Sequence, residues 1–208
     1  MKVLVIGTGN MGASFVKQFA AAGHQVTVTA RDAAKAQALA ERFGAKSVPS
    51  AGAASDRDVI VLATGYADAV AALQGVGDLA GKTVVDITNP VAADFMSLTI
   101  GHTTSAAETI AAAIPGAHVV KAFNTVFAQV LAAGPELDGR KVSVFVASDD
   151  KGAKETVKAL AQSVGFDVVD TGGLGNARYL EPLGGLNIYL GYGAGLGTSI
   201  APTWLRNA

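Results

Sequence analysis

The chain has 208 residues, half of which are apolar while only 16% are charged, so it predicts a large buried core with little solvated surface. Its formal net charge of −1 at pH 7 gives no electrostatic footprint for nucleic acid or for an anionic membrane. The absence of cysteine excludes disulfides and cysteine-based metal sites, and the three histidines lie too far apart in sequence to suggest a metal-binding pair.

The sequence also gives no sign of membrane insertion or export. The longest mainly apolar run, residues 183–200, is interrupted by recurring glycines and by Asn187, so it does not make the roughly 18 uninterrupted apolar residues of a membrane span. The first strand pattern starts within three residues of Met1 and is too short for a signal peptide. We therefore expect a cytoplasmic protein with no membrane partner and no nucleic-acid partner.

A glycine-rich turn follows the first strand pattern directly. Residues 3–6 are apolar, the turn reads Gly7-x-Gly9-x-x-Gly12, and a helical pattern begins at once. Gly7 permits the tight turn, Gly9 leaves room for a diphosphate, and Gly12 lets the helix pack closely on the strand. Because the helix N-terminus attracts anions, this context predicts dinucleotide binding rather than a purely structural turn. The binding residues predicted here are Gly7, Thr8, Gly9, Asn10, Met11 and Gly12.

The end of the second strand pattern, residues 25–29, predicts which dinucleotide is bound. An enzyme that prefers NAD usually has Asp or Glu at this point, whereas this chain has Ala30 followed by Arg31. Arg31 can hold a 2′-phosphate, and Lys35 can add a second cation one helical turn later. We assign Asp32 as the N-cap of a helix over residues 33–43. These features favour NADP, and the alternative is that both cations are merely solvated.

Strand and helix patterns then alternate almost without pause. This alternation predicts an α/β fold of the Rossmann type: one doubly wound, mostly parallel sheet with a short helical, glycine-rich C-terminal tail. We expect one NADP-binding domain over residues 1–208, with a core over 1–170 and a C-terminal helix and tail over 171–208. The predicted later strands are residues 45–48, 59–63, 83–87, 118–123, 141–147 and 166–170, and the predicted later helices are 67–73, 105–114, 126–132 and 151–164.

Ligands in such sheets lie beyond the carboxyl ends of the strands. Two turns at these ends are therefore candidates for the middle and nicotinamide half of the cofactor, although Asn89 is equally consistent with a plain turn residue before proline. The aperiodic stretch 91–104, which holds Phe95 and Met96, has the length of a binding loop. The turn residues predicted to bind are Ala63, Thr64, Gly65, Asn89, Pro90 and Val91.

The last part of the chain looks mainly structural. Asn176 is a candidate helix N-cap, and Arg178 and Glu181 are spaced to form an ion pair on one helix face. The remainder is apolar, rich in glycine and carries the only tryptophan, Trp204. Such a surface suggests a protein partner, most simply a second copy of the chain in a homodimer.

Taken together, these motifs resemble the NADPH-dependent deazaflavin-coenzyme oxidoreductase family, which also includes the cytosolic reductase domain of six-transmembrane metalloreductases. The resemblance covers nearly the whole chain. It rests on Gly7-Thr8-Gly9-Asn10-Met11-Gly12, Arg31, Ser105-Ala106-Ala107-Glu108, Val120-Lys121-Ala122-Phe123-Asn124 and Gly172-x-Leu174-x-Asn176-Ala177-Arg178-x-x-Glu181.

The resemblance implies a role for several residues. Residues 8–11 would hold the diphosphate, and Ala30, Arg31 and Lys35 would take the 2′-phosphate end. Thr64, the turn at residues 89–91 and Ala128 would line the nicotinamide side. Deazaflavin reductases tend to have histidine where this chain has Asn124, so the resemblance implies NADP(H) but leaves the electron acceptor open between a flavin and a deazaflavin coenzyme.

We therefore predict an NADPH-dependent oxidoreductase that transfers a hydride between NADP(H) and a flavin or deazaflavin coenzyme. The cofactors supply that chemistry, which agrees with a sequence that offers no catalytic acid–base constellation. One alternative is a dehydrogenase or imine reductase on a small substrate, for which Lys121 would be the proton donor. We expect Lys121 instead to be a strand residue with its head in solvent. The other alternative is a non-catalytic NADPH-binding regulator.

Overall fold

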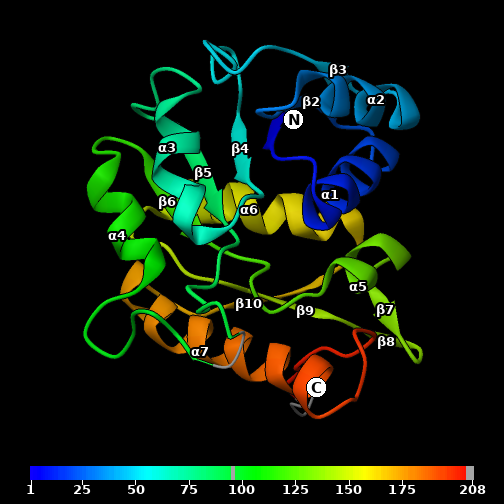
Figure 1. Ribbon diagram of the computed structural model, residues 1–208, viewed down its shortest axis with the longest axis vertical. Coiled ribbons are helices and arrows are strands. Elements are labelled where there is room, and N and C mark those ends of the chain that lie inside the picture. Colours follow the sequence, from blue (N-terminus) through cyan, green and yellow to red (C-terminus); the bar gives the residue numbers. More distant parts are fainter. Residues whose placement is uncertain (95–96, 205–208) are drawn as a thin grey trace.

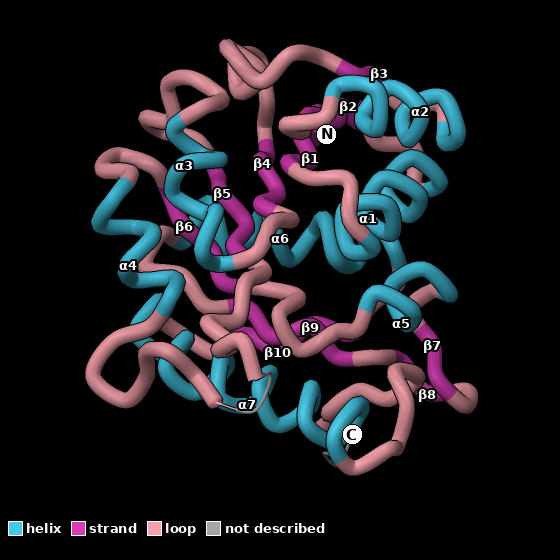
Figure 2. Tube along the Cα trace, in the orientation of Figure 1, coloured by secondary structure: helices cyan, strands magenta, loops and turns pink. Residues whose placement is uncertain are grey.

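The computed structural model describes residues 1–94 and 97–204; Phe95 and Met96 of the expected binding loop, and the last four residues of the tail, lie outside this part. A six-stranded parallel sheet forms its centre, with the strand order β3-β2-β1-β4-β5-β6. Figures 1 and 2 show these strands side by side with helices around them. The strands are β1 (Lys2–Ile6), β2 (Gln25–Thr29), β3 (Lys46–Ser47), β4 (Val59–Leu62), β5 (Thr83–Asp86) and β6 (His118–Lys121).

Alternate residues of the central strands enter two separate cores. Val3 and Val5 of β1 face a core built with helices α1, α2, α5 and α6, whereas Leu4 and Ile6 face a core built with α3 and α4. Because side chains alternate across a strand, a sheet covered on both faces needs apolar residues at every position. This explains the unbroken apolar runs of β1 and β4, and the two cores confirm the predicted doubly wound Rossmann-type α/β fold. The helices are α1 (Asn10–Ala21), α2 (Ala33–Phe43), α3 (Ala69–Gln74), α4 (Ala106–Ala113), α5 (Ala128–Ala133), α6 (Lys151–Val164) and α7 (Ala177–Ile188).

The prediction of one continuous sheet is wrong beyond β6. Strands β9 (Ser143–Val146) and β10 (Asp167–Asp170) form a two-stranded parallel sheet of their own. An isolated antiparallel bridge between Lys121 and Ala147 connects it to β6. The bridge joins the last residue of β6 to the residue that follows β9, so the two strands run on in different directions from this point and no ladder forms. A short hairpin of β7 (Glu136–Leu137) and β8 (Arg140–Lys141) precedes β9 and was not predicted.

Three helices begin with a side-chain cap, and of the two caps predicted above, Asp32 is confirmed and Asn176 is not. The side chain of Asp32 accepts a hydrogen bond from the Lys35 amide at the start of α2, as predicted. Asp150 does the same for α6, and Ser105 for α4. Asn176 precedes α7, but its side chain donates to the Thr171 carbonyl and makes no cap bond.

Helix α7 crosses the molecule at the bottom of Figure 1, next to the sheet of β9 and β10. It continues into a π-helical turn (Tyr189–Gly193), which agrees with the expected packed helix followed by a glycine-rich segment. Within the described residues, no helix combines the length and apolar character that crossing a membrane requires.

Candidate functional site

The turn after β1 has the geometry expected of a diphosphate cradle. Gly7 has a φ of +118°, and a Cβ there would overlap the carbonyl oxygen of Ala63. A Cβ on Gly12 would overlap the carbonyl oxygen of Gly7, whereas a Cβ on Gly9 would meet nothing within 4 Å. Gly9 also caps α1 without any side-chain hydrogen bond. The first amides of α1 therefore have no side-chain acceptor among the described residues and adjoin open space, which is a site for an anion.

A cavity of about 560 Å³ opens on one side of this turn. Its walls come from the ends of β1, β2 and β4, so three segments far apart in sequence meet here. This is the carboxyl edge of the sheet, where ligands of such folds bind. The predicted residues that line it are Gly7, Thr8, Gly9, Ala30, Arg31, Lys35, Ala63, Thr64 and Gly65.

The two cations of this cavity are each paired with a carboxylate that also lines it. Arg31 lies 3.3 Å from Asp68, and Lys35 lies 3.4 Å from Asp32. The pKa of Asp32 is lowered, first by the hydrogen bond from the Lys35 amide and also by the Lys35 side chain. The Arg31 side chain is 91% exposed, and exposed pairs of this kind contribute about 0–1 kcal/mol. A phosphate can therefore displace either carboxylate at little cost.

A second cavity of about 300 Å³ lies on the other side of the first turn of α1. Most of its wall is apolar or amide, and no aspartate, glutamate, lysine or histidine is among its lining residues in the described part of the chain. The predicted residues that line it are Asn10, Met11, Asn89, Asn124 and Ala128. The prediction missed the wall contributed by α7 and the π-helical turn, which consists of Gly184, Asn187, Ile188 and Tyr192. The polar Asn187 in an otherwise apolar run was the only signal for it.

Three predicted residues line neither cavity. Gly12 is buried beneath the turn, where its lack of a side chain allows the close contact with Gly7. Pro90 is buried, and its carbonyl accepts a hydrogen bond of 2.7 Å from the Thr99 amide. Val91 lines a separate cavity of about 290 Å³ with Leu98.

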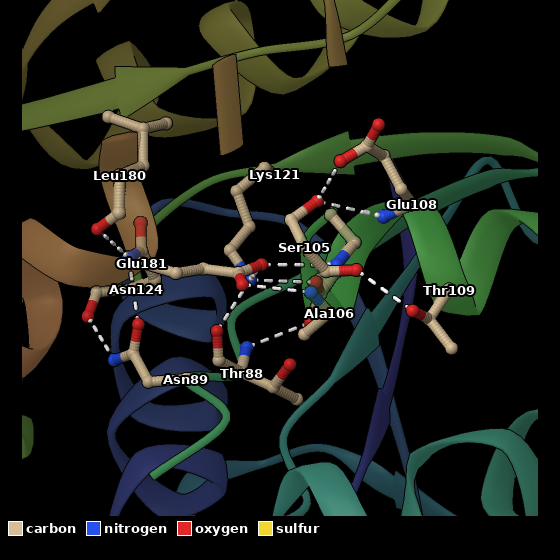
Figure 3. Close-up of polar contacts among 12 residues, drawn as sticks. Thr88, Asn89, Ser105, Ala106, Glu108, Thr109, Lys121, Asn124, Leu180 and Glu181 are labelled. Carbon is tan, nitrogen blue, oxygen red and sulfur yellow. Dashed lines mark hydrogen bonds and ion pairs between the residues drawn. The ribbon is translucent and has the colours of Figure 1, made fainter. Parts of the chain in front are cut away.

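Asn89, in the turn after β5, forms two hydrogen bonds with Asn124. The side-chain NH₂ group of Asn89 donates to the Asn124 main-chain carbonyl at 2.7 Å. The side-chain oxygen of Asn89 accepts from the Asn124 side chain at 2.9 Å (Figure 3). Asn124 also donates to the Leu180 carbonyl of α7 at 2.7 Å. A Cβ on Gly184 would overlap the Asn89 amide, so the absence of a side chain there lets α7 approach closely. The pair thus fixes one wall of the second cavity.

Lys121 is fully buried, so the expectation of a solvent-exposed head is wrong. Its ammonium lies 2.8 Å from Asp86 and 2.8 Å from Glu181, and it donates to the Thr88 carbonyl (Figure 3). Asp86 ends the neighbouring strand, and Glu181 comes from α7. The strand pattern alone could not reveal these partners, because an exposed and an ion-paired lysine occupy the same kind of strand-end position.

The predicted ion pair between Arg178 and Glu181 is also wrong. Glu181 turns inward and accepts hydrogen bonds from the Ala106 and Ala107 amides at 2.8 and 3.1 Å, at the start of α4. Arg178 pairs instead with Glu108, and its Nε donates at 2.9 Å. Hydrogen bonds from the Arg178 guanidinium are the largest reason that the pKa of Glu108 is lowered. Both acids therefore join α7 to α4.

The fold and site together define a dinucleotide-binding protein of the Rossmann class, and comparison with known proteins identifies its family. Residues 2–90 match the family described as NADP oxidoreductase, coenzyme F420-dependent. The F420-dependent NADP reductase of Methanothermobacter marburgensis is 31% identical over 213 residues, which cover 91% of this chain and 92% of that protein. The chain therefore belongs to the F420-dependent NADP oxidoreductase family.

Two further similarities agree with this assignment. The crystal structure of a putative F420-dependent NADP reductase from Arthrobacter sp. FB24 is 32% identical, with a TM-score of 0.88, and the match covers 99% of this chain and 100% of that one. Metalloreductase STEAP3 of Rattus norvegicus is 33% identical over 183 residues, which cover 88% of this chain. The chain spans only about 36% of that metalloreductase.

The buried Lys121 cluster should contribute strongly to stability. Lys121→Met removes the cation but keeps the volume, leaving Asp86 and Glu181 buried without their partner. We expect a loss of about 3–5 kcal/mol in the free energy of unfolding, measured by urea denaturation. Lys46→Met on the exposed edge strand β3 is the control and should change stability by less than about 0.5 kcal/mol. Equal stability of the two variants would contradict the importance of the cluster.

Proposed function

We propose that the protein transfers a hydride between NADP(H) and a flavin or deazaflavin coenzyme. The observation that carries the proposal is a pair of cavities, one beside the turn of residues 7–9 and the other beside the first turn of α1. One has the phosphate cradle and cations that suit NADP. The other is mainly apolar with amide groups and suits a flat ring placed against the nicotinamide. Assignment to the F420-dependent NADP oxidoreductase family supports the same pair of ligands.

The residues fit an NADP cofactor in two independent ways. A side chain on Gly9 would meet nothing within 4 Å, so the space next to this residue is open. The first amides of α1, which follow Gly9, have no side-chain acceptor among the described residues. On the nicotinamide side, two residues that line the second cavity have a buried side-chain oxygen without a hydrogen-bond partner within the described residues: Asn124 Oδ1 and Thr125 Oγ1. Buried polar atoms are usually satisfied, so unsatisfied ones beside a cavity are consistent with a polar ligand or bound water there.

Each part of the site would have a distinct task. Gly7, Thr8 and Gly9 would bind the diphosphate, while Ala30, Arg31 and Lys35 would surround the adenosine phosphate. Residues 63–65 would cover the middle of the cofactor, and the remaining cavity residues Asn10, Met11, Asn89, Asn124 and Ala128 would orient the two rings. Gly12, Pro90 and Val91 would act indirectly, by shaping these turns. Bound NADP(H) supplies the hydride chemistry, and the protein contributes position and the exclusion of water.

The competing functions have less support. Reduction of an imine or ketone requires a proton donor, and Lys121, the candidate named from the sequence, is buried between two carboxylates. A regulator would bind NADPH through the same cradle but would need no second cavity.

The single domain over residues 1–208, the cytoplasmic location and the homodimer remain predictions. The exposed Tyr179, Leu186, Tyr189, Tyr192, Leu196 and Trp204 support a partner surface for the homodimer.

The direct test mixes the protein with NADPH and a coenzyme in a stopped-flow instrument. We expect NADPH absorbance to fall together with reduction of coenzyme F420, 5-deazariboflavin 5′-phosphate or FMN. NADH in place of NADPH is the control and should react more slowly at subsaturating concentration. Tight NADPH binding without oxidation by any of these acceptors would favour the regulator and refute the proposed reaction.

Arg31→Gln should weaken NADPH selectively, since it removes the guanidinium available to the 2′-phosphate. We expect its Kd for NADPH, measured by titration calorimetry, to rise about five- to tenfold, a modest value because the side chain is exposed. The Kd for NADH should be unchanged. Lys46→Gln, which removes an exposed charge outside both cavities, should leave both values as in the wild type. A parallel loss for both cofactors would show that Arg31 does not read the phosphate.

Gly9→Ala and Gly12→Ala should separate binding from folding. A methyl group at Gly9 enters open space, so the melting temperature should hardly change while NADPH affinity falls. A methyl group at Gly12 overlaps the Gly7 carbonyl and should lower the melting temperature by several degrees, equivalent to about 1–3 kcal/mol. Unaltered NADPH affinity in Gly9→Ala would place the diphosphate elsewhere.

A further inference from the structure

A groove of about 330 Å³ lies between α1, the end of α2 and α5, which Figure 1 shows on the same side of the molecule. Residues 10, 13, 14 and 17 of α1 line it. Residues at this spacing share one face of a helix. The groove is thus a distinct surface. It shares no lining residue with the cavity of about 560 Å³ that contains Arg31 and Lys35, which we call the adenosine cavity.

The groove carries two positive charges and no negative one. Lys17 donates one hydrogen bond to the Ala132 carbonyl at 2.7 Å, which leaves two of its three N–H groups available. The Arg42 guanidinium lies 5.0 Å from the centre of the Phe43 ring. In the part of the chain that the structure describes, neither cation pairs with a carboxylate, and no Asp or Glu lines the groove. Arg31 and Lys35 of the adenosine cavity, by contrast, are both paired.

The groove is next to the second cavity. Asn10, Ala128 and Gln129 line both. The second cavity, at about 300 Å³, is at the lower limit for a small-molecule site, so it can hold a ring system but not a whole coenzyme. The remainder of a bound coenzyme must leave the cavity, and these three shared residues mark a route that leads to the two unpaired cations.

We propose that the groove binds the anionic side chain of the electron-accepting coenzyme, while the ring occupies the second cavity. This rests on the proposed function, because it assumes that a flavin-type ring binds there. The acceptor class is thereby narrowed to coenzymes whose ribityl chain ends in phosphate or carboxylate groups. Lys17 and Arg42 are the residues that distinguish them from uncharged flavins.

The test uses 5-deazariboflavin and its 5′-phosphate, which differ only in the anionic group. Each is titrated into the NADP⁺-loaded protein, where no hydride transfer occurs, and binding is followed by fluorescence. We expect the wild type to bind the phosphate about five- to tenfold more tightly, and this preference to shrink as salt is added, because both cations are exposed. The double variant Lys17→Gln/Arg42→Gln should lose the preference while its affinity for 5-deazariboflavin and NADP⁺ stays unchanged.

The double variant Lys46→Gln/Lys151→Gln is the matched control, because it removes two exposed cations outside the groove. It should keep the wild-type preference. The proposal is overturned if the wild type shows no preference, if Lys17→Gln/Arg42→Gln keeps it, or if that variant loses NADP⁺ affinity instead. Coenzyme F420, with its phosphate and glutamate groups, should show a larger effect than the single phosphate. Absence of hydride transfer would count against the proposed function, while these titrations would still decide the role of the groove.

Discussion

The architecture of the site depends on one buried ion cluster. Lys121 lies between Asp86 and Glu181 with essentially no exposure of the three side chains to solvent. Burying ions costs several kcal/mol each, and that cost is offset only when partners and hydrogen bonds are complete. Here the second carboxylate also accepts two amides at the start of α4, where the helix dipole favours a negative charge. The cluster therefore unites β5, β6, α4 and α7 at one point.

This cluster explains why a helix outside the central sheet can form part of the site. The Rossmann core alone supplies the cradle and the adenosine cavity, but the second cavity needs a wall from α7. Glu181 anchors α7, and Asn187 adds a hydrogen bond of 3.1 Å to the Thr125 carbonyl one and a half turns later. The absence of a side chain at Gly184 then brings the helix against Asn89. The ion pair of Glu181 and the close packing at Gly184 together hold α7 in position as a wall of the second cavity.

Local features of this structure could be predicted from the sequence, because their partners are near in the chain. The caps at Asp32, Ser105 and Asp150 involve amides three residues away, and the cradle is contained within a strand, a turn and a helix. Two-sided burial of the strands was equally visible in their apolar runs. The glycine turn and the turns after β2 and β4 likewise line the first cavity, whereas Asn124 and Ala128 of the second cavity were named from the family resemblance and not from a local pattern.

The errors concern partners that are distant in sequence. Lys121 and Asp86 are 35 residues apart, and Arg178 and Glu108 are 70 apart, so spacing along one helix or strand gives no information about either pair. Arg178 has a suitable acid three residues away, yet Glu181 is already committed to the buried lysine. Likewise, β9 has the pattern of an ordinary buried strand, yet its segment meets β6 at a single isolated bridge and so stays outside the central sheet. Tertiary context decided each of these cases.

Helix α1 links the two halves of the site physically. Its first amides face the cradle, Asn10 and Met11 face the second cavity, and the next turns face the cationic groove. The first turns of the helix are held in place: Gly12 sits tightly on Gly7, and Ser14 donates to the Ala128 carbonyl at 3.0 Å. Hydride transfer requires two rings held at a constant separation. A single short helix that begins at the cradle and lines the second cavity would meet that requirement, since a displacement of α1 would shift both surfaces together.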